Sequence, residues 1–166
     1  MAGGTRGDEA GRNGQADFDF FMGRWTVRNR RLKERLRGCD AWEEFEGTAS
    51  AWPLWGGQAN VDEIEADTPA GPLRGLTLRL YEPASGQWRL YWGNGARGIL
   101  DPPMVGAFAD GRGEFFGHEI FEGRGVLVRY LWSRITPTSC RWEQAFSPDG
   151  GRSWETNWIM EFTRRP

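Results

Sequence analysis

The chain has 166 residues, with 21 basic and 23 acidic side chains and a net charge of −2. That length suits one domain with a single hydrophobic core. The basic residues form no block, and this argues against a nucleic-acid partner because phosphate binding needs a concentrated positive face. Ten Trp, ten Phe and three Tyr are many aromatic residues for this length, and such side chains suit strands and cavity linings.

Residues 1–16 are polar and rich in glycine. They offer little to bury, so we expect a disordered tail ahead of a single domain covering residues 17–166. The tail lacks the apolar segment of a signal peptide, and no later run is long enough to cross a bilayer. We therefore expect a cytoplasmic protein with no membrane partner, in which Cys39 and Cys140 stay reduced.

A short apolar segment, Phe18 to Met22, is about one helical turn long and leads into the first predicted strand. Alternation predicts this strand from Trp25 to about Leu36, although its second half is charged on both faces and could instead form a short helix. Residues 67–72 are a predicted loop, and residues 95–103 are predicted to be irregular. The other predicted strands are Trp42–Trp52, Ala59–Glu65, Leu76–Tyr81, Trp88–Asn94, Val105–Phe108, Glu114–Phe121, Val126–Ile135, Cys140–Phe146 and Trp154–Arg164.

About ten strands joined mostly by short turns, with no helix longer than two turns, indicate an all-β fold. We predict a closed antiparallel up-and-down β-barrel, because closure removes the exposed edges of the sheet. An open sandwich is the alternative. A ten-stranded barrel is wide enough to hold a cavity that its own side chains need not fill.

Gly23-Arg24-Trp25 opens the first strand, and Arg164 and Arg165 end the last one. This arrangement resembles calycin-type barrels, the lipocalins and fatty-acid-binding-protein-like proteins. The resemblance implies that the Trp packs across the closed end of the barrel with an Arg of the final strand over it, held by a cation–π interaction.

The segments 18–25 and 141–161 resemble, more specifically, an uncharacterised bacterial family of such barrels. That resemblance covers the chain from about residue 18 to its end and implies no established activity. Haem-binding relatives take their iron ligand from a His near the C-terminus. Residues 154–164 contain no His, so haem binding is not transferred.

Residues 147–154, with the sequence SPDGGRSW, fit the Asp-box pattern with Ser in the place of Thr. In this motif the carboxylate accepts backbone N–H groups within the turn and the Trp packs beneath it. A single copy predicts a structural turn in the hairpin between the last two strands.

His118 is the single histidine, and it shares a predicted strand face with Phe116 and Ile120. If that face is the inside of the barrel, His118 would contact a ligand or act as an acid or base. The alternative is a hydrogen-bonded histidine packed against aromatic side chains.

Several other polar residues are in phase with large apolar residues on their strands. If these residues face inward, the barrel contains a cavity with aromatic walls and a few convergent polar groups, which is how ligand sites are built. Alternatively, they satisfy one another or buried water, and a one-residue register shift would exchange every face. Most of a set of six carboxylates are expected on the solvated outer face, and these are Glu43, Glu44, Glu46, Asp62, Glu63 and Glu65. The candidate ligand-binding residues are Arg31, Trp92, Asn94, Arg134 and Gln144, and the candidate catalytic residues are His118 and Tyr130.

The leading hypothesis is the binding of a small hydrophobic or aromatic molecule in the barrel, with Arg31 and Arg134 as partners for an anionic group. The alternative is a cofactor-independent isomerase, cyclase or hydratase acting on a polyketide- or terpene-like substrate, in which His118 or Tyr130 moves a proton. A third hypothesis is a structural or partner-binding barrel with a packed interior. The sequence has no cofactor motif and no metal-ligand spacing, and it leaves the oligomeric state open, a homodimer included.

Overall fold

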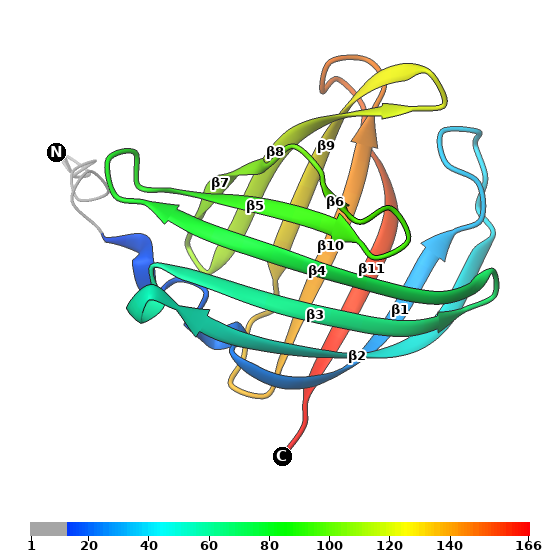
Figure 1. Cartoon of the computed structure of the whole chain (residues 1–166). Coiled ribbons are helices and arrows are strands. Elements are labelled where there is room, and N and C mark those ends of the chain that lie inside the picture. Colours follow the sequence, from blue (N-terminus) through cyan, green and yellow to red (C-terminus); the bar gives the residue numbers. More distant parts are fainter. Residues whose placement is uncertain (1–12) are drawn as a thin grey trace, which may run out of the picture.

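The computed structural model describes residues 13–166, which form one antiparallel sheet closed into a barrel (Figure 1). The sheet order is β4-β3-β2-β1-β11-β10-β9-β8-β7-β5, and pairing of β4 with β5 closes it. The prediction of a closed antiparallel barrel of about ten strands is confirmed. The strands are β1 (Gly23–Leu32), β2 (Trp42–Leu54), β3 (Ala59–Thr68), β4 (Gly71–Glu82), β5 (Gln87–Asn94), β6 (Ile99–Leu100), β7 (Met104–Ala109), β8 (Arg112–Phe121), β9 (Arg124–Ser133), β10 (Ser139–Ser147) and β11 (Glu155–Arg164).

Three segments differ clearly from their predictions. β1 ends at Leu32, and residues 33–37 form bends rather than a strand or a helix. The predicted loop at 67–72 is mostly strand, because β3 and β4 stay paired up to Thr68 and Gly71. The segment 95–103 contains the short strand β6, which pairs with the end of β5 and lies outside the ten-stranded ring.

The predicted tail falls mainly on residues 1–12, outside the described residues. Its last part, η1 (Gly14–Ala16), is a turn of 3₁₀ helix attached to the barrel. The Gly14 backbone N–H donates to the Tyr81 hydroxyl at 3.0 Å, and the Gly14 carbonyl accepts from the Trp88 indole at 3.1 Å. These two bonds place η1 against one end of the barrel.

A second turn of 3₁₀ helix, η2 (Asp19–Phe21), and its neighbour Phe18 close the same end, which we call the closed end. Phe18 and Phe21 are each 1% exposed, and Trp25 is fully buried behind them. Phe21 stacks on Trp25 with ring centroids 5.6 Å apart, and Phe18 meets Trp132 edge-on at 5.9 Å. Aromatic pairs at these separations add to the energy of burial, so the apolar N-terminal segment acts as the plug of the barrel.

The predicted pair of a first-strand Trp and a last-strand Arg is present. The guanidinium of Arg164 lies 4.2 Å from the ring centre of Trp25. Its nitrogens donate to the carbonyls of Phe20 and Met22, each at 2.6 Å, and to the carbonyl of Pro137 at 2.9 Å. Arg164 therefore ties the plug, the first strand and the last strand together at the closed end.

The opposite end, which we call the mouth, is formed by the connections at 33–41, 69–70, 95–103, 122–123 and 148–154. The last of these is the predicted Asp-box turn. Asp149 accepts from the backbone N–H of Ser153 at 2.9 Å, from its hydroxyl at 2.6 Å and from the Ser147 hydroxyl at 2.9 Å. Trp154 lies just before β11 and packs against Phe116, so within this turn the motif has the structural role predicted for it.

Cys39 and Cys140 are both free thiols. Cys39 lies in the β1–β2 connection at the mouth, whereas Cys140 is buried in β10 near the closed end. Burial raises the pKa of the Cys140 thiol to about 12, so it stays protonated. None of the helices in residues 13–166 has the length and apolar character needed to cross a membrane.

Candidate functional site

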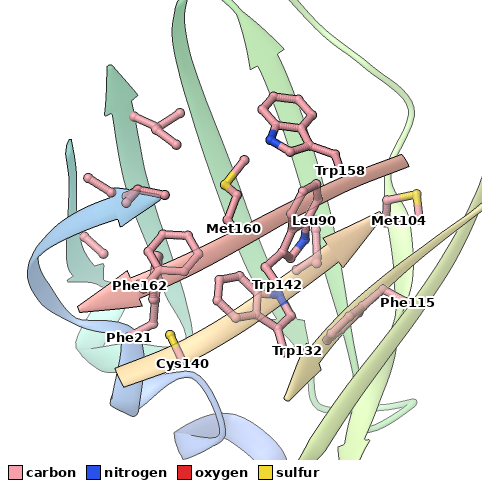
Figure 2. Packing of buried hydrophobic residues seen from close by; sticks show 14 of the residues in the cluster. Phe21, Leu90, Met104, Phe115, Trp132, Cys140, Trp142, Trp158, Met160 and Phe162 are labelled. Atoms are coloured by element: carbon pink, nitrogen blue, oxygen red, sulfur yellow. The ribbon is translucent and has the colours of Figure 1, made fainter. Parts of the chain in front are cut away.

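A cavity of about 850 Å³ occupies the barrel between the aromatic plug and the mouth. Inward-facing rings form much of its wall, and Figure 2 shows Trp158, Met160 and Phe162 projecting from β11 beside Trp142 on β10. This volume is within the range of small-molecule sites, about 300–1,000 Å³. The plug fills only one end, so the ten strands leave a chamber behind it, as their number predicts.

Strand register brings three of the candidate residues, Tyr130, Gln144 and Arg31, into one row with Trp158 on the inner wall. Tyr130 pairs with Gln144, Gln144 with Trp158, and Trp158 with Arg31. Directly opposed residues of antiparallel strands project from the same face of the sheet. All four line the cavity, so this row runs across β9, β10, β11 and β1.

A β-bulge between Gln144 and Ala145 places Asn157 beside this row. The Gln144 amide nitrogen donates to the Asn157 side-chain oxygen at 2.8 Å, and Asn157 is fully buried. Within residues 13–166 the Asn157 amide nitrogen has no hydrogen-bond partner. Bulges often re-aim a side chain next to a binding site, and here the bulge turns an amide pair towards the inside of the barrel.

Tyr130 packs edge-on against Trp142 with ring centroids 5.0 Å apart. Burial, with smaller contributions from the carboxylates of Glu119 and Asp101, raises the pKa of the Tyr130 phenol. The phenol therefore stays protonated near neutral pH and presents an O–H group to the cavity wall.

Trp92 and Asn94 lie on β5, and both line the cavity near its mouth. The Trp92 ring lies over Gly75 of β4, where a Cβ atom would come within 1.9 Å of the ring. Gly75 is thus the residue that allows this ring its position. The Asn94 side-chain oxygen accepts the backbone N–H of Ala96 at 2.9 Å, so Asn94 also fixes the turn after β5.

The floor of the cavity holds a buried ion pair between Arg79 and Asp62. The Arg79 side chain also donates to Asn60 at 3.0 Å, and its guanidinium lies 5.0 Å from the ring centre of Phe18 and 5.3 Å from that of Phe21. Burial raises the pKa of the Asp62 carboxyl, while the Arg79 guanidinium opposes the rise.

Most of the six carboxylates named in the sequence analysis were expected on the outer face, and Asp62 is an exception because it lines the cavity. Its strand alternation turns Asp62 inward, where Arg79 supplies the partner that a buried charge needs. The same alternation on β4 turns Leu76 and Leu78 outward, because Thr77 and Arg79 line the cavity. Apolar residues alone therefore do not mark the inner face of this strand.

His118 is an exposed residue at the rim of the cavity. The apolar face that it shares with Phe116 and Ile120 is the outer face of β8, since these two side chains are 46% and 74% exposed while Phe115 is fully buried. The interpretation that this face lines the inside of the barrel is therefore wrong. His118 contributes to the cavity only at its mouth.

Arg134 is exposed and is not among the residues that line the cavity. Its predicted phase assumed that β9 continues to Ile135, but the strand ends at Ser133 and Arg134 has a φ of 52°. A positive φ interrupts strand alternation. The structure therefore places this candidate anion partner outside the cavity.

Four charged groups at the mouth were not singled out by the sequence analysis, and they are Arg35, Arg97, Asp101 and Glu119. Arg97 pairs with Asp101 four residues later. Burial raises the pKa of the Glu119 carboxyl, while Arg35 opposes the rise. The alternation that begins at Trp25 would have placed Arg35 in phase with Arg31, and the ambiguity of residues 33–36 obscured that signal.

Across residues 13–166, no group of three or more His, Cys, Asp or Glu side chains is arranged to hold a metal ion. The wall instead offers aromatic contact area, the phenol of Tyr130, the amides of Asn94 and Gln144 and several guanidinium groups. Such a lining suits an apolar or aromatic molecule with a few polar atoms.

The fold is similar to that of the S-type phycobiliprotein lyase CPES from Guillardia theta, with a TM-score of 0.62 and 10% identity over 93% of this chain and 94% of that chain. A de novo designed fluorescence-activating β-barrel aligns with a TM-score of 0.45 and 14% identity over 89% of this chain and 95% of the designed one. At these identities the likeness to the lyase shows the fold alone, and that fold fits a calycin-like barrel. No protein-family model matches the sequence, and no curated protein matches it.

Proposed function

We propose that this protein binds a small, largely apolar or aromatic molecule inside the barrel. The observation that carries the proposal is the cavity of about 850 Å³ behind the plug. Its aromatic wall would supply contact area, and its few polar groups would orient the ligand. A structural barrel with a packed interior has no need of such a chamber.

Native mass spectrometry of freshly purified protein is the first test, followed by extraction and identification of any bound molecule. A stoichiometric small molecule is expected. The second test uses N-phenyl-1-naphthylamine, a neutral aromatic probe whose fluorescence rises in apolar surroundings. Wild-type protein is expected to bind it with one-to-one stoichiometry.

Two matched variants on β4 locate the probe. Leu73 lines the cavity, whereas Leu76 on the same strand points outward and is 37% exposed. Leu73→Trp narrows the chamber and is expected to weaken probe binding about tenfold, while Leu76→Trp stays within about twofold of wild type. A wild-type protein that binds no probe, or a Leu73→Trp variant that binds it normally, would contradict the proposal.

A second candidate function is cofactor-independent isomerisation, cyclisation or hydration of a polyketide- or terpene-like substrate in the same cavity. The observation that favours it is Tyr130, whose partly buried phenol lines the wall and stays protonated because its pKa is raised. A protonated phenol would be available to donate a hydrogen bond or its proton to a substrate oxygen. His118, exposed at the rim, would serve only for a group held at the mouth.

This second function is tested with the molecule recovered from the protein. If that molecule is turned over, Tyr130→Phe is expected to lower kcat at least about a hundredfold with little change in KM. Unchanged turnover in this variant would exclude Tyr130 as the acid, and unchanged turnover in His118→Ala would exclude His118.

A further inference from the structure

Arg35 lies at the mouth of the cavity, in the connection that follows β1. Although β1 ends at Leu32, Arg35 still lines the cavity together with Arg31. The next residue, Leu36, donates its backbone N–H to the Glu155 carboxylate at 2.7 Å, which ties this connection to β11. The Arg35 guanidinium carbon lies 5.4 Å from the ring centre of Phe146. The side chain is therefore held against the wall of the barrel.

Within residues 13–166, Arg35 lacks the close counter-ion that the other arginines of the cavity have. Arg31 pairs with Glu43 at 2.7 Å, Arg79 with Asp62, and Arg97 with Asp101. For Arg35, no carboxylate of residues 13–166 lies within ion-pair distance. A partly buried guanidinium without a close partner is a group that favours binding of an anion.

The electrostatic surroundings agree with this geometry. Burial, and then the neighbouring Arg31 guanidinium, lowers the pKa of Arg35, while Glu119, Tyr130 and Glu155 oppose the change. The Glu119 side chain lines the mouth, and partial removal from water raises the pKa of its carboxyl. Glu119 thus lies near Arg35 without pairing with it, and a bound anion would have to compete with this carboxylate.

We propose that the molecule held in the barrel is an amphipathic anion, whose apolar or aromatic body occupies the chamber and whose carboxylate, sulfonate or phosphate group binds Arg35 beside Arg31. This inference rests on the proposed function and names the chemical class of its ligand. The planar fork of a guanidinium matches the oxygens of such groups. Partial removal from water strengthens the attraction.

Two probes that differ only by a sulfonate test the inference. They are 8-anilinonaphthalene-1-sulfonate, an anion, and N-phenyl-1-naphthylamine, its neutral counterpart. In the full chain, Arg35→Gln is expected to weaken binding of the anion about tenfold and to leave binding of the neutral probe within about twofold. The matched control is Arg37→Gln, because Arg37 pairs with Glu122 at the surface and should change neither affinity.

A second variant gives a gain that misfolding cannot imitate. Glu119→Gln removes the competing carboxylate, so it is expected to raise affinity for the anionic probe about threefold without changing that for the neutral one. The inference is overturned if Arg35→Gln lowers both affinities equally, or if it lowers neither. In either case, binding of the neutral probe by the wild-type protein still supports the proposed function. If wild-type protein binds neither probe, both the proposed function and this inference fail.

Discussion

The two ends of the barrel use the same residue types for different purposes. At the closed end, Trp25 and the plug residues Phe18 and Phe21 are at most 1% exposed and pack ring against ring. Towards the mouth, Trp142 and Trp158 are each 8% exposed and line the chamber. A few apolar residues ahead of the first strand account for this difference, because they fill one end of a barrel that is too wide to fill itself.

Arginine side chains show the same contrast. Arg164 covers Trp25 at the closed end and donates to three backbone carbonyls, so its guanidinium is used entirely within the protein. At the other end, Arg31 lies over Trp158 at 5.2 Å with Glu43 as its partner, and Arg35 has no carboxylate of residues 13–166 within ion-pair distance. The contacts that stabilise the fold are thus concentrated at the plug, and the charged groups of the proposed binding site lie towards the mouth.

The largest expected effect comes from breaking the closed end. Trp25→Ala removes a fully buried ring, the indole N–H bond to the Phe21 carbonyl at 2.8 Å and the surface that Arg164 covers. We expect the free energy of unfolding to fall by about 3–5 kcal/mol, the cost of truncating a large core aromatic residue. Chemical denaturation followed by circular dichroism measures the loss.

The matched control is Trp55→Ala, because Trp55 is 73% exposed and should change the free energy of unfolding by less than about 0.5 kcal/mol. Equal losses in the two variants would refute the assignment of stability to the plug.

A smaller effect is expected from the amide pair in the chamber wall. Gln144→Met keeps the length of the side chain but leaves the buried Asn157 oxygen without its donor at 2.8 Å. We expect a loss of about 1–2 kcal/mol in the free energy of unfolding, the cost of an unsatisfied buried acceptor. Gln87→Met, at an exposed position on β5, is the control. A neutral Gln144→Met variant would show that water or a rotated amide replaces the bond.

The closed end was the more predictable of the two. The Trp25–Arg164 contact could be predicted because it belongs to a familiar motif. The strands could be predicted because alternation between turns depends on residues close together in sequence. The mouth depends on where alternation stops, since the bends after Leu32 keep Arg35 on the cavity wall. The closed end has one error of the same kind, because Arg134, in the β9–β10 connection, has a positive φ and lies outside the cavity.

The sequence also could not show which face of each strand lies inside the barrel. On β8 the face that carries Phe116 and Ile120 is the outer one, and on β4 the face that carries Thr77 and Arg79 is the inner one. Burying Arg79 depends on Asp62, which is seventeen residues away and on the neighbouring strand. The strand-to-strand register that joins them cannot be derived from composition.

The smallest effect concerns the Asp-box turn at the mouth. Hydrogen bonds from Ser153, ahead of those from Ser147 and Arg152, lower the pKa of Asp149 to about 2, whereas an unfolded Asp titrates near about 3.9. A lowered pKa in the folded state stabilises the protein fully above the unfolded value, and this contribution disappears as the pH falls towards the folded value.

We therefore expect the difference in Tm between wild type and Asp149→Asn to be constant above about pH 5 and to shrink between about pH 4 and pH 2. Other carboxylates titrate in both proteins, so their effects cancel in this difference. A difference that does not change with pH would mean that the carboxylate charge adds nothing to the turn. Because the turn lies at the mouth and Trp25 at the opposite end, combining Asp149→Asn with Trp25→Ala should give additive losses.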